Sequence, residues 1–129
     1  MDPSLSPTLA RLVARAVGDP HVLAVMLFGS HARGDATPVS DVDVCLVAPT
    51  APSNEEATRI RLDYLSAFDL DIAVFQQVPL YVRARILKEG RVLFVRDEDA
   101  LYALAIRTVR AWEDFRHIHR LYLEEVARG

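Results

Sequence analysis

Several features that define particular classes of protein are scarce in this sequence. Among its 129 residues there is one cysteine, Cys45, so no intrachain disulfide can form and a zinc site built on several cysteines is excluded. The longest continuous apolar run, residues 22–28, is far shorter than the ~20 residues that span a bilayer. The N-terminus lacks the basic start and apolar core of a secretion signal. These absences predict a cytoplasmic protein that uses no membrane.

A surplus of positive charge is also missing. The chain has 15 basic and 18 acidic residues, a net charge of -3, and every basic residue except Lys88 is an arginine. Because binding to nucleic acids usually requires a basic surplus, this balance argues against a DNA partner. Hydrophobic residues make up 51% of the chain, which is typical of a globular protein, and the length suits one domain spanning residues 1–129.

Helical and strand patterns alternate along the chain. Ser6 is expected to cap a first helix, and Gly18 to end it. Ser53 and Glu56 have the spacing of a capping box at the start of a second helix. The pattern predicts a small mixed α/β domain in which about four strands are flanked by helices. The expected helices are 7–17, 53–66, 79–89 and 97–127, and the expected strands are 22–28, 41–47, 68–75 and 92–95.

Two carboxylates on one expected strand form a candidate metal site. Asp41 and Asp43 are two residues apart, so on a strand they point to the same face with α-carbons roughly 6–7 Å apart. Both can reach one hard cation such as Mg²⁺, which prefers oxygen ligands. Without a cation or a basic partner the pair would repel and lower stability. A solvated pair on a strand is the ordinary alternative reading.

Other residues add to this candidate site. Asp71, on a later strand, would supply a third carboxylate, and three carboxylates can hold two cations about 4 Å apart for phosphoryl or nucleotidyl transfer. Gly29 and Ser30 directly follow a buried strand, where a glycine allows close approach of a phosphate and a hydroxyl can donate to it. Arg33 would add a cationic fork. Taken singly, each has an ordinary reading as a turn or a solvated residue.

The combined pattern resembles a known signature. Residues 29–34 read Gly-Ser-His-Ala-Arg-Gly, and residues 40–44 read Ser-Asp-Val-Asp-Val. This arrangement resembles the polymerase-beta-type nucleotidyltransferase superfamily, and its form closely resembles the minimal nucleotidyltransferases, or MNT domains. The similarity extends over residues 79–90, 92–97 and 112–116, which look like MntA-type antitoxins of HEPN–MNT toxin–antitoxin pairs.

The resemblance implies a polymerase-beta-like core that uses Mg²⁺, in a two-ion site, and ATP. It implies transfer of AMP to a tyrosine of a cognate HEPN RNase toxin, and hence a hetero-oligomer with that toxin. By position, Asp41 and Asp43 would hold both metal ions, and Asp71 would bind the catalytic one and help to deprotonate the attacking hydroxyl. The triphosphate would lie against four residues: Gly29, Ser30, Arg33 and Ser40. Asp69 is an alternative to Asp71, which matches the family spacing better.

Two other functions compete with this one. A binding-only antitoxin would neutralise the toxin by forming a complex, but it would have no need of mutually repulsive carboxylates. A nucleotidyltransferase for a small molecule would need a substrate pocket, and the short chain leaves little for one beyond the core.

The C-terminal helix, about residues 98–127, carries more apolar surface than one buried face needs. Leu101, Trp112, Phe115 and Tyr122 belong to one stripe, and Leu121 widens it. Either the helix packs on its own core or part of it contacts the partner protein.

Overall fold

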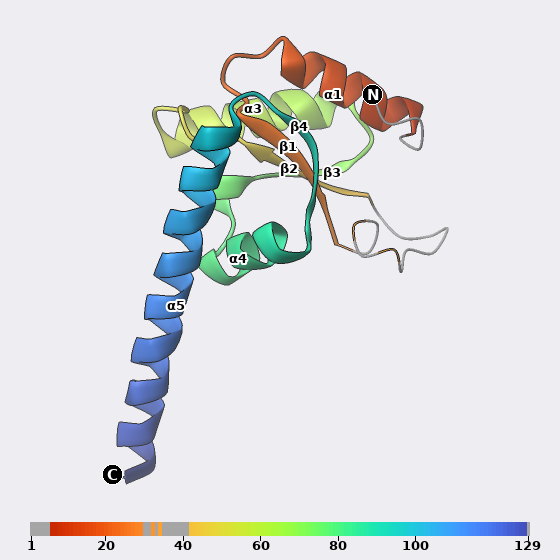
Figure 1. The fold of residues 1–129 in the computed structure, drawn as a ribbon. Coiled ribbons are helices and arrows are strands. Elements are labelled where there is room, and N and C mark those ends of the chain that lie inside the picture. Colours follow the sequence, from red (N-terminus) through yellow and green to blue (C-terminus); the bar gives the residue numbers. More distant parts are fainter. Residues whose placement is uncertain (1–5, 30–31, 33, 35–41, 129) are drawn as a thin grey trace.

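The computed structural model describes residues 6–29, 32, 34 and 42–128, and its elements follow the predicted order (Figure 1). All four predicted strands and all four predicted helices are present, and a short 3₁₀ helix, η1, was not predicted. In chain order the elements are α1 (Pro7–Val17), β1 (Ala24–Phe28), β2 (Asp43–Val47), α3 (Asn54–Ala67), β3 (Asp71–Val74), η1 (Phe75–Gln77), α4 (Leu80–Glu89), β4 (Arg91–Val95) and α5 (Glu98–Arg128).

Local capping explains where the first two of these helices begin. The Ser6 hydroxyl accepts a hydrogen bond from the Leu9 amide at 3.2 Å, and the Ser53 hydroxyl accepts one from the Glu56 amide at 3.1 Å. Each bond satisfies an amide that has no partner within the helix. The side chain of Glu56 forms an ion pair with Arg59. Both predicted N-caps are therefore confirmed.

The four strands form one sheet in the order β3-β2-β1-β4. β1 pairs antiparallel with β2 and with β4, whereas β2 and β3 are parallel and are connected through α3. A parallel pair needs such a crossover connection, because the chain must return to the same end of the sheet. As a result, β2 and β3 both start at the same edge of the sheet.

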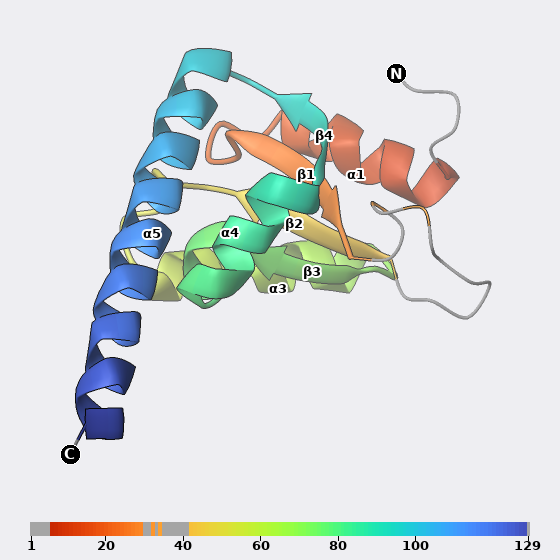
Figure 2. The ribbon, with the colours of Figure 1, turned by 60° about the horizontal axis from the view of Figure 1, so that its bottom comes forward.

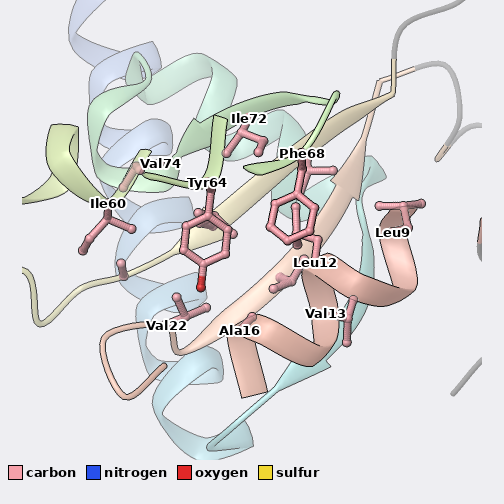
Figure 3. Packing of buried hydrophobic residues seen from close by; sticks show 14 of the residues in the cluster. Leu9, Leu12, Val13, Ala16, Val22, Ile60, Tyr64, Phe68, Ile72 and Val74 are labelled. Atoms are coloured by element: carbon pink, nitrogen blue, oxygen red, sulfur yellow. The ribbon is translucent and has the colours of Figure 1, made fainter. Parts of the chain in front are cut away.

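Helices cover both faces of the sheet (Figures 1 and 2). On one face α1 and α3 contribute Leu12 and Tyr64 to a core that includes Val25, Leu46 and Ile72 from the strands, as Figure 3 shows for part of this cluster. The smaller cluster on the other face consists of Ala24, Met26, Cys45, Val47, Phe75 and Ile86, with residues of α5 packed against it. Alternate residues of β1 and of β2 thus enter different cores, as the pleat of a strand requires.

Three strands are shorter than predicted, and one of them, expected at residues 41–47, starts at Asp43. The strand expected at residues 68–75 starts at Asp71, because the Phe68 amide still donates to the Tyr64 carbonyl as the C-cap of α3. It ends at Val74, where η1 begins. The strand expected at residues 22–28 starts at Ala24, and the Val22 amide closes a turn onto the Asp19 carbonyl.

α5 is anchored at only one end. It packs beside α4, and Thr108 is its one buried residue, whereas the C-terminal half projects beyond the rest of the molecule in both views (Figures 1 and 2). The expectation that the whole helix packs on its own core is therefore wrong for this half. Within the described part of the chain, no helix combines the length and apolar character needed to cross a membrane.

Candidate active site

Asp43 and Asp71 lie side by side at the edge where β2 and β3 start. They are directly paired in the parallel ladder, and the Asp71 amide donates to the Val42 carbonyl at 3.0 Å. Neighbouring strands are about 4.8 Å apart, and paired residues point to the same face, so the two carboxylates can converge on one cation. Asp71 is exposed and Asp43 is partly exposed, which leaves both accessible to a ligand from solvent.

Gly29 packs against the Asp43 side chain from the β1 side. It follows β1 directly, and its φ of +74° lies in a region that side chains disfavour. A Cβ built on Gly29 would overlap Oδ2 of Asp43. The carboxylate thus rests against the glycine backbone, and Gly29 is the residue type that both the backbone and the neighbouring side chain require.

Several predicted site residues cannot be placed. Ser30, Arg33, Ser40 and Asp41 lie outside the described residues. Among the described residues, no three histidine, cysteine or acidic side chains gather closely enough to hold a metal ion. The structure therefore brings together three of the predicted residues, namely Gly29, Asp43 and Asp71.

Asp69 stands apart from this group. It is exposed, precedes β3, and has no partner in the β2–β3 ladder, whereas Asp71 is the residue paired with Asp43. The shared face expected for Asp69 and Asp71 required a strand through both residues, and the chain bends before Asp71 instead.

The donor set suits a hard divalent cation. Carboxylate oxygens are the side-chain ligands that Mg²⁺ takes, and it commonly uses one or two of them together with substrate phosphates. Cys45, the next residue of β2 on the same face, is fully buried, and burial raises the pKa of its thiol to about 12. It stays protonated and belongs to the core.

A small pocket adjoins these residues on the β1 side. It has a volume of about 170 Å³ and lies between the end of β1 and α4, lined by Phe28, Gly29, Val82, Arg85, Ile86 and Glu89. Sequence reasoning did not single out the α4 residues for a site. The available signal was the spacing of Arg85 and Glu89, which places both on one side of a helix.

The sequence matches the profile of the polymerase beta nucleotidyltransferase family over residues 11–99. The chain belongs to this family. A relative from Methanocaldococcus jannaschii, named as a candidate protein adenylyltransferase, MJ1547, is 30% identical over 93 residues, which are 72% of this chain and 71% of the relative. The match to the family profile ends near the start of α5.

Solved structures share the fold of this nucleotidyltransferase. A chain from a toxin–antitoxin complex with AMP-PNP aligns with a TM-score of 0.68 at 17% identity, covering 92% of this chain and 95% of that one. A chain from a tri-AMPylated Shewanella oneidensis HEPN toxin in complex with its MNT antitoxin aligns with a TM-score of 0.63 at 16% identity, covering 90% and 93%. At these identities the likeness establishes the fold, including the four-stranded mixed sheet.

Proposed function

We propose that this nucleotidyltransferase is an antitoxin that transfers AMP from ATP, with Mg²⁺, to a tyrosine of a cognate HEPN RNase toxin. The observation that carries the proposal is the pairing of Asp43 with Asp71, with Gly29 packed against Asp43. The name of the archaeal relative and the likeness to antitoxin chains in solved complexes support the choice of a protein as acceptor. The cytoplasm, where ATP is available, is the proposed location.

The chemistry is nucleotidyl transfer. The acceptor oxygen forms a bond to the α-phosphorus of ATP, the bond from that phosphorus to the bridging oxygen breaks, and pyrophosphate leaves. Asp71 accepts the proton of the acceptor hydroxyl from the β3 side of the site. Asp43 and Asp41 would hold the two cations, with Asp71 sharing one of them, and bound Mg²⁺ would neutralise the phosphate charge.

Residues near the end of β1 would bind the triphosphate. Gly29 has no side chain that could stand between the main chain at the end of β1 and the phosphate oxygens. Ser30, Arg33 and Ser40 are proposed to donate hydrogen bonds to the same oxygens. The acceptor would therefore approach from β3, and the leaving pyrophosphate would lie toward Gly29, on the opposite side of the α-phosphorus.

The projecting half of α5 is proposed to contact the toxin. Around Thr108 the apolar stripe of α5 packs on the rest of the domain. The stripe continues along the projecting half of the helix through Phe115, Tyr122 and Val126, which are 52%, 65% and 59% exposed. Exposed apolar side chains gathered in this way commonly mark a protein interface. This surface lies beyond the residues that the family profile matches.

The deciding experiment follows AMP on the toxin. The antitoxin would be incubated with the toxin encoded beside it, ATP and Mg²⁺, and the toxin weighed by intact mass spectrometry. We expect one or more AMP masses with wild type, none with Asp41→Asn/Asp43→Asn, and none with Asp71→Asn. Asp69→Asn is the matched control, because this neighbouring carboxylate has no place beside Asp43, and it should transfer AMP normally.

A binding-only antitoxin is the competing function. It predicts that no AMP is added and that the carboxylate variants still neutralise the toxin as well as wild type does. That result would overturn transfer to the toxin while leaving the family fold intact. Transfer of AMP to a small molecule but not to the toxin would favour the third function.

A further inference from the structure

The pocket between β1 and α4 adjoins the carboxylate site through Gly29. Gly29 forms part of its wall and also touches Asp43, so whatever occupies the pocket lies next to the reacting groups. The lining is largely apolar, with Phe28 from the sheet and Val82 and Ile86 from α4. Arg85 and Glu89 add one charge of each sign and form an ion pair at 3.7 Å, in which Arg85 is exposed and Glu89 is partly exposed.

The size of the pocket restricts its occupant to part of a substrate. A site for a whole drug-sized ligand usually has a volume of about 300–1,000 Å³. An apolar cavity of about 150 Å³ is enough to hold a benzene ring. With about 170 Å³ and an open side, this pocket matches a planar ring whose edge reaches toward solvent. It is too small for a complete nucleotide.

The position of the pocket distinguishes between the two rings that the reaction involves. The sheet order places β2 between β1 and β3, so Asp71 and the pocket lie on opposite sides of Asp43. The acceptor hydroxyl is proposed to approach Asp71, and therefore the tyrosine ring belongs on the β3 side. The ring on the β1 side is then the base of the nucleotide, which extends from the same α-phosphate.

We infer that the pocket between β1 and α4 holds the purine base of the nucleotide and determines which nucleoside triphosphate is used. This inference rests on the proposed nucleotidyl transfer. Phe28 and Val82 contact the ring, and the planar guanidinium of Arg85 stacks on its exposed part. The Glu89 carboxylate accepts a hydrogen bond from an exocyclic amino group of the base.

The first test measures nucleotide binding in the absence of toxin. Val82→Trp fills the pocket, and Val92→Trp is the matched control, because Val92 is exposed on β4 away from this pocket. Dissociation constants for ATP and for inorganic tripolyphosphate would be determined by calorimetry with Mg²⁺ present. We expect Val82→Trp to weaken ATP binding at least tenfold and to leave tripolyphosphate binding unchanged, whereas Val92→Trp changes neither.

A second variant is needed in case Val82→Trp perturbs the fold, which circular dichroism and thermal unfolding would reveal. Glu89→Gln keeps the shape of the side chain and turns one acceptor oxygen into a donor. We expect it to change the ratio of ATP to GTP affinity several-fold, because the two bases present different groups at their edges. Arg107→Gln, an exposed change on α5, should leave this ratio unaltered.

Three results would overturn the inference. Wild-type ATP affinity in a folded Val82→Trp variant would exclude the base from the pocket. An unchanged ratio of ATP to GTP affinity in Glu89→Gln would also exclude the base from the pocket. A rise in the KM for toxin with ATP binding intact would assign the pocket to the acceptor ring instead. Because binding is measured without toxin, failure of protein AMPylation would not affect this reading.

Discussion

At the scale of single residues, Gly29 shows how one position serves both backbone and site. Its positive φ and its contact with Asp43 each disfavour a side chain. Tyr64 shows a comparable double role in the core, where its ring is buried and its hydroxyl donates to the Asp19 carboxylate at 3.0 Å. Each role can be tested by a small substitution, which adds a methyl group at Gly29 or removes the hydroxyl of Tyr64.

Gly29→Ala should reduce AMP transfer strongly. The added methyl group would displace the Asp43 carboxylate, and a misplacement of about 1 Å can cost about 100-fold in rate. Single-turnover transfer to the toxin is the measurement. Gly34→Ala separates the causes, because Gly34 also has a positive φ but no atom of the described residues lies within 4 Å of an added Cβ. Equal losses in the two variants would point to backbone strain and not to overlap with Asp43.

Tyr64→Phe should lower the free energy of unfolding by about 1 kcal/mol near pH 7, the typical value for one lost hydrogen bond. Burial, followed by the hydrogen bond to Asp19, raises the pKa of Tyr64 above its ordinary value of 10. The stabilisation is thus complete below pH 10, where the unfolded chain also keeps this proton. It decreases as the pH rises further, because the unfolded chain then loses the proton first.

The measurement for Tyr64 is urea unfolding of both proteins between pH 7 and pH 11. The difference in unfolding free energy should shrink above pH 10. Cys45, whose pKa is also raised, is present in both proteins and cancels from the difference. A difference that stays constant up to pH 11 would show that the Tyr64 hydroxyl is not held in this way.

At the scale of elements, the two ends of α5 have different environments. Near its start the helix packs against α4 and against the smaller core cluster, which includes Met26 and Ile86. Beyond Trp112, whose ring stacks on Phe115 with centroids 5.6 Å apart, the apolar stripe has no partner among the described residues that would bury it. Hydrophobic periodicity predicted the helix correctly, but the pattern is the same whether its own core or another protein covers the stripe.

Tyr122→Ser/Val126→Ser should weaken the complex with the toxin at least tenfold. The two side chains are exposed on the same face of α5 beyond the body, so the fold of the isolated protein should not change. Calorimetric titration with toxin and circular dichroism of the free variant are the measurements. His117→Ser/Glu124→Ser lies on a different face of the same helix turns and should bind normally. Normal binding by both variants would exclude this surface.

At the scale of the whole molecule, Arg96 connects segments from both ends of the family core. Its guanidinium donates to the carbonyls of Val22, Ala16 and Asp19 at 3.1, 2.9 and 2.9 Å, and also to that of Val17. Two of these carbonyls belong to the last turn of α1, where helix carbonyls lack partners within the helix. Arg96 therefore holds α1 against the end of β4.

Arg96→Lys should lower the free energy of unfolding by about 2 kcal/mol. Lysine keeps the charge but cannot donate in several fixed directions at once, so some of the carbonyls would lose their partners. Chemical denaturation is the measurement, with Arg107→Lys on the exposed surface of α5 as the control. A change below about 0.5 kcal/mol, the usual range for surface substitutions, would contradict this role.

The sequence by itself determined the order of the elements, both helix N-caps and the alternation that puts Asp43 and Cys45 on one face of a strand. These features depend on residues within a turn or two of one another, so local chemistry decides them. The family, too, could be inferred from short motifs, since glycine, serine and two aspartates at fixed spacing carry its chemistry.

Only the tertiary structure decided which distant residues meet. The pairing of β2 with β3 places Asp71 beside Asp43, and the end of β1 brings Gly29 against Asp43. Arg96 likewise binds four carbonyls of residues 16–22, which are far from it in the chain. The pocket is also formed by distant segments, the end of β1 and α4. Strand order and register depend on how all the apolar faces are buried together, and no local pattern contains that information.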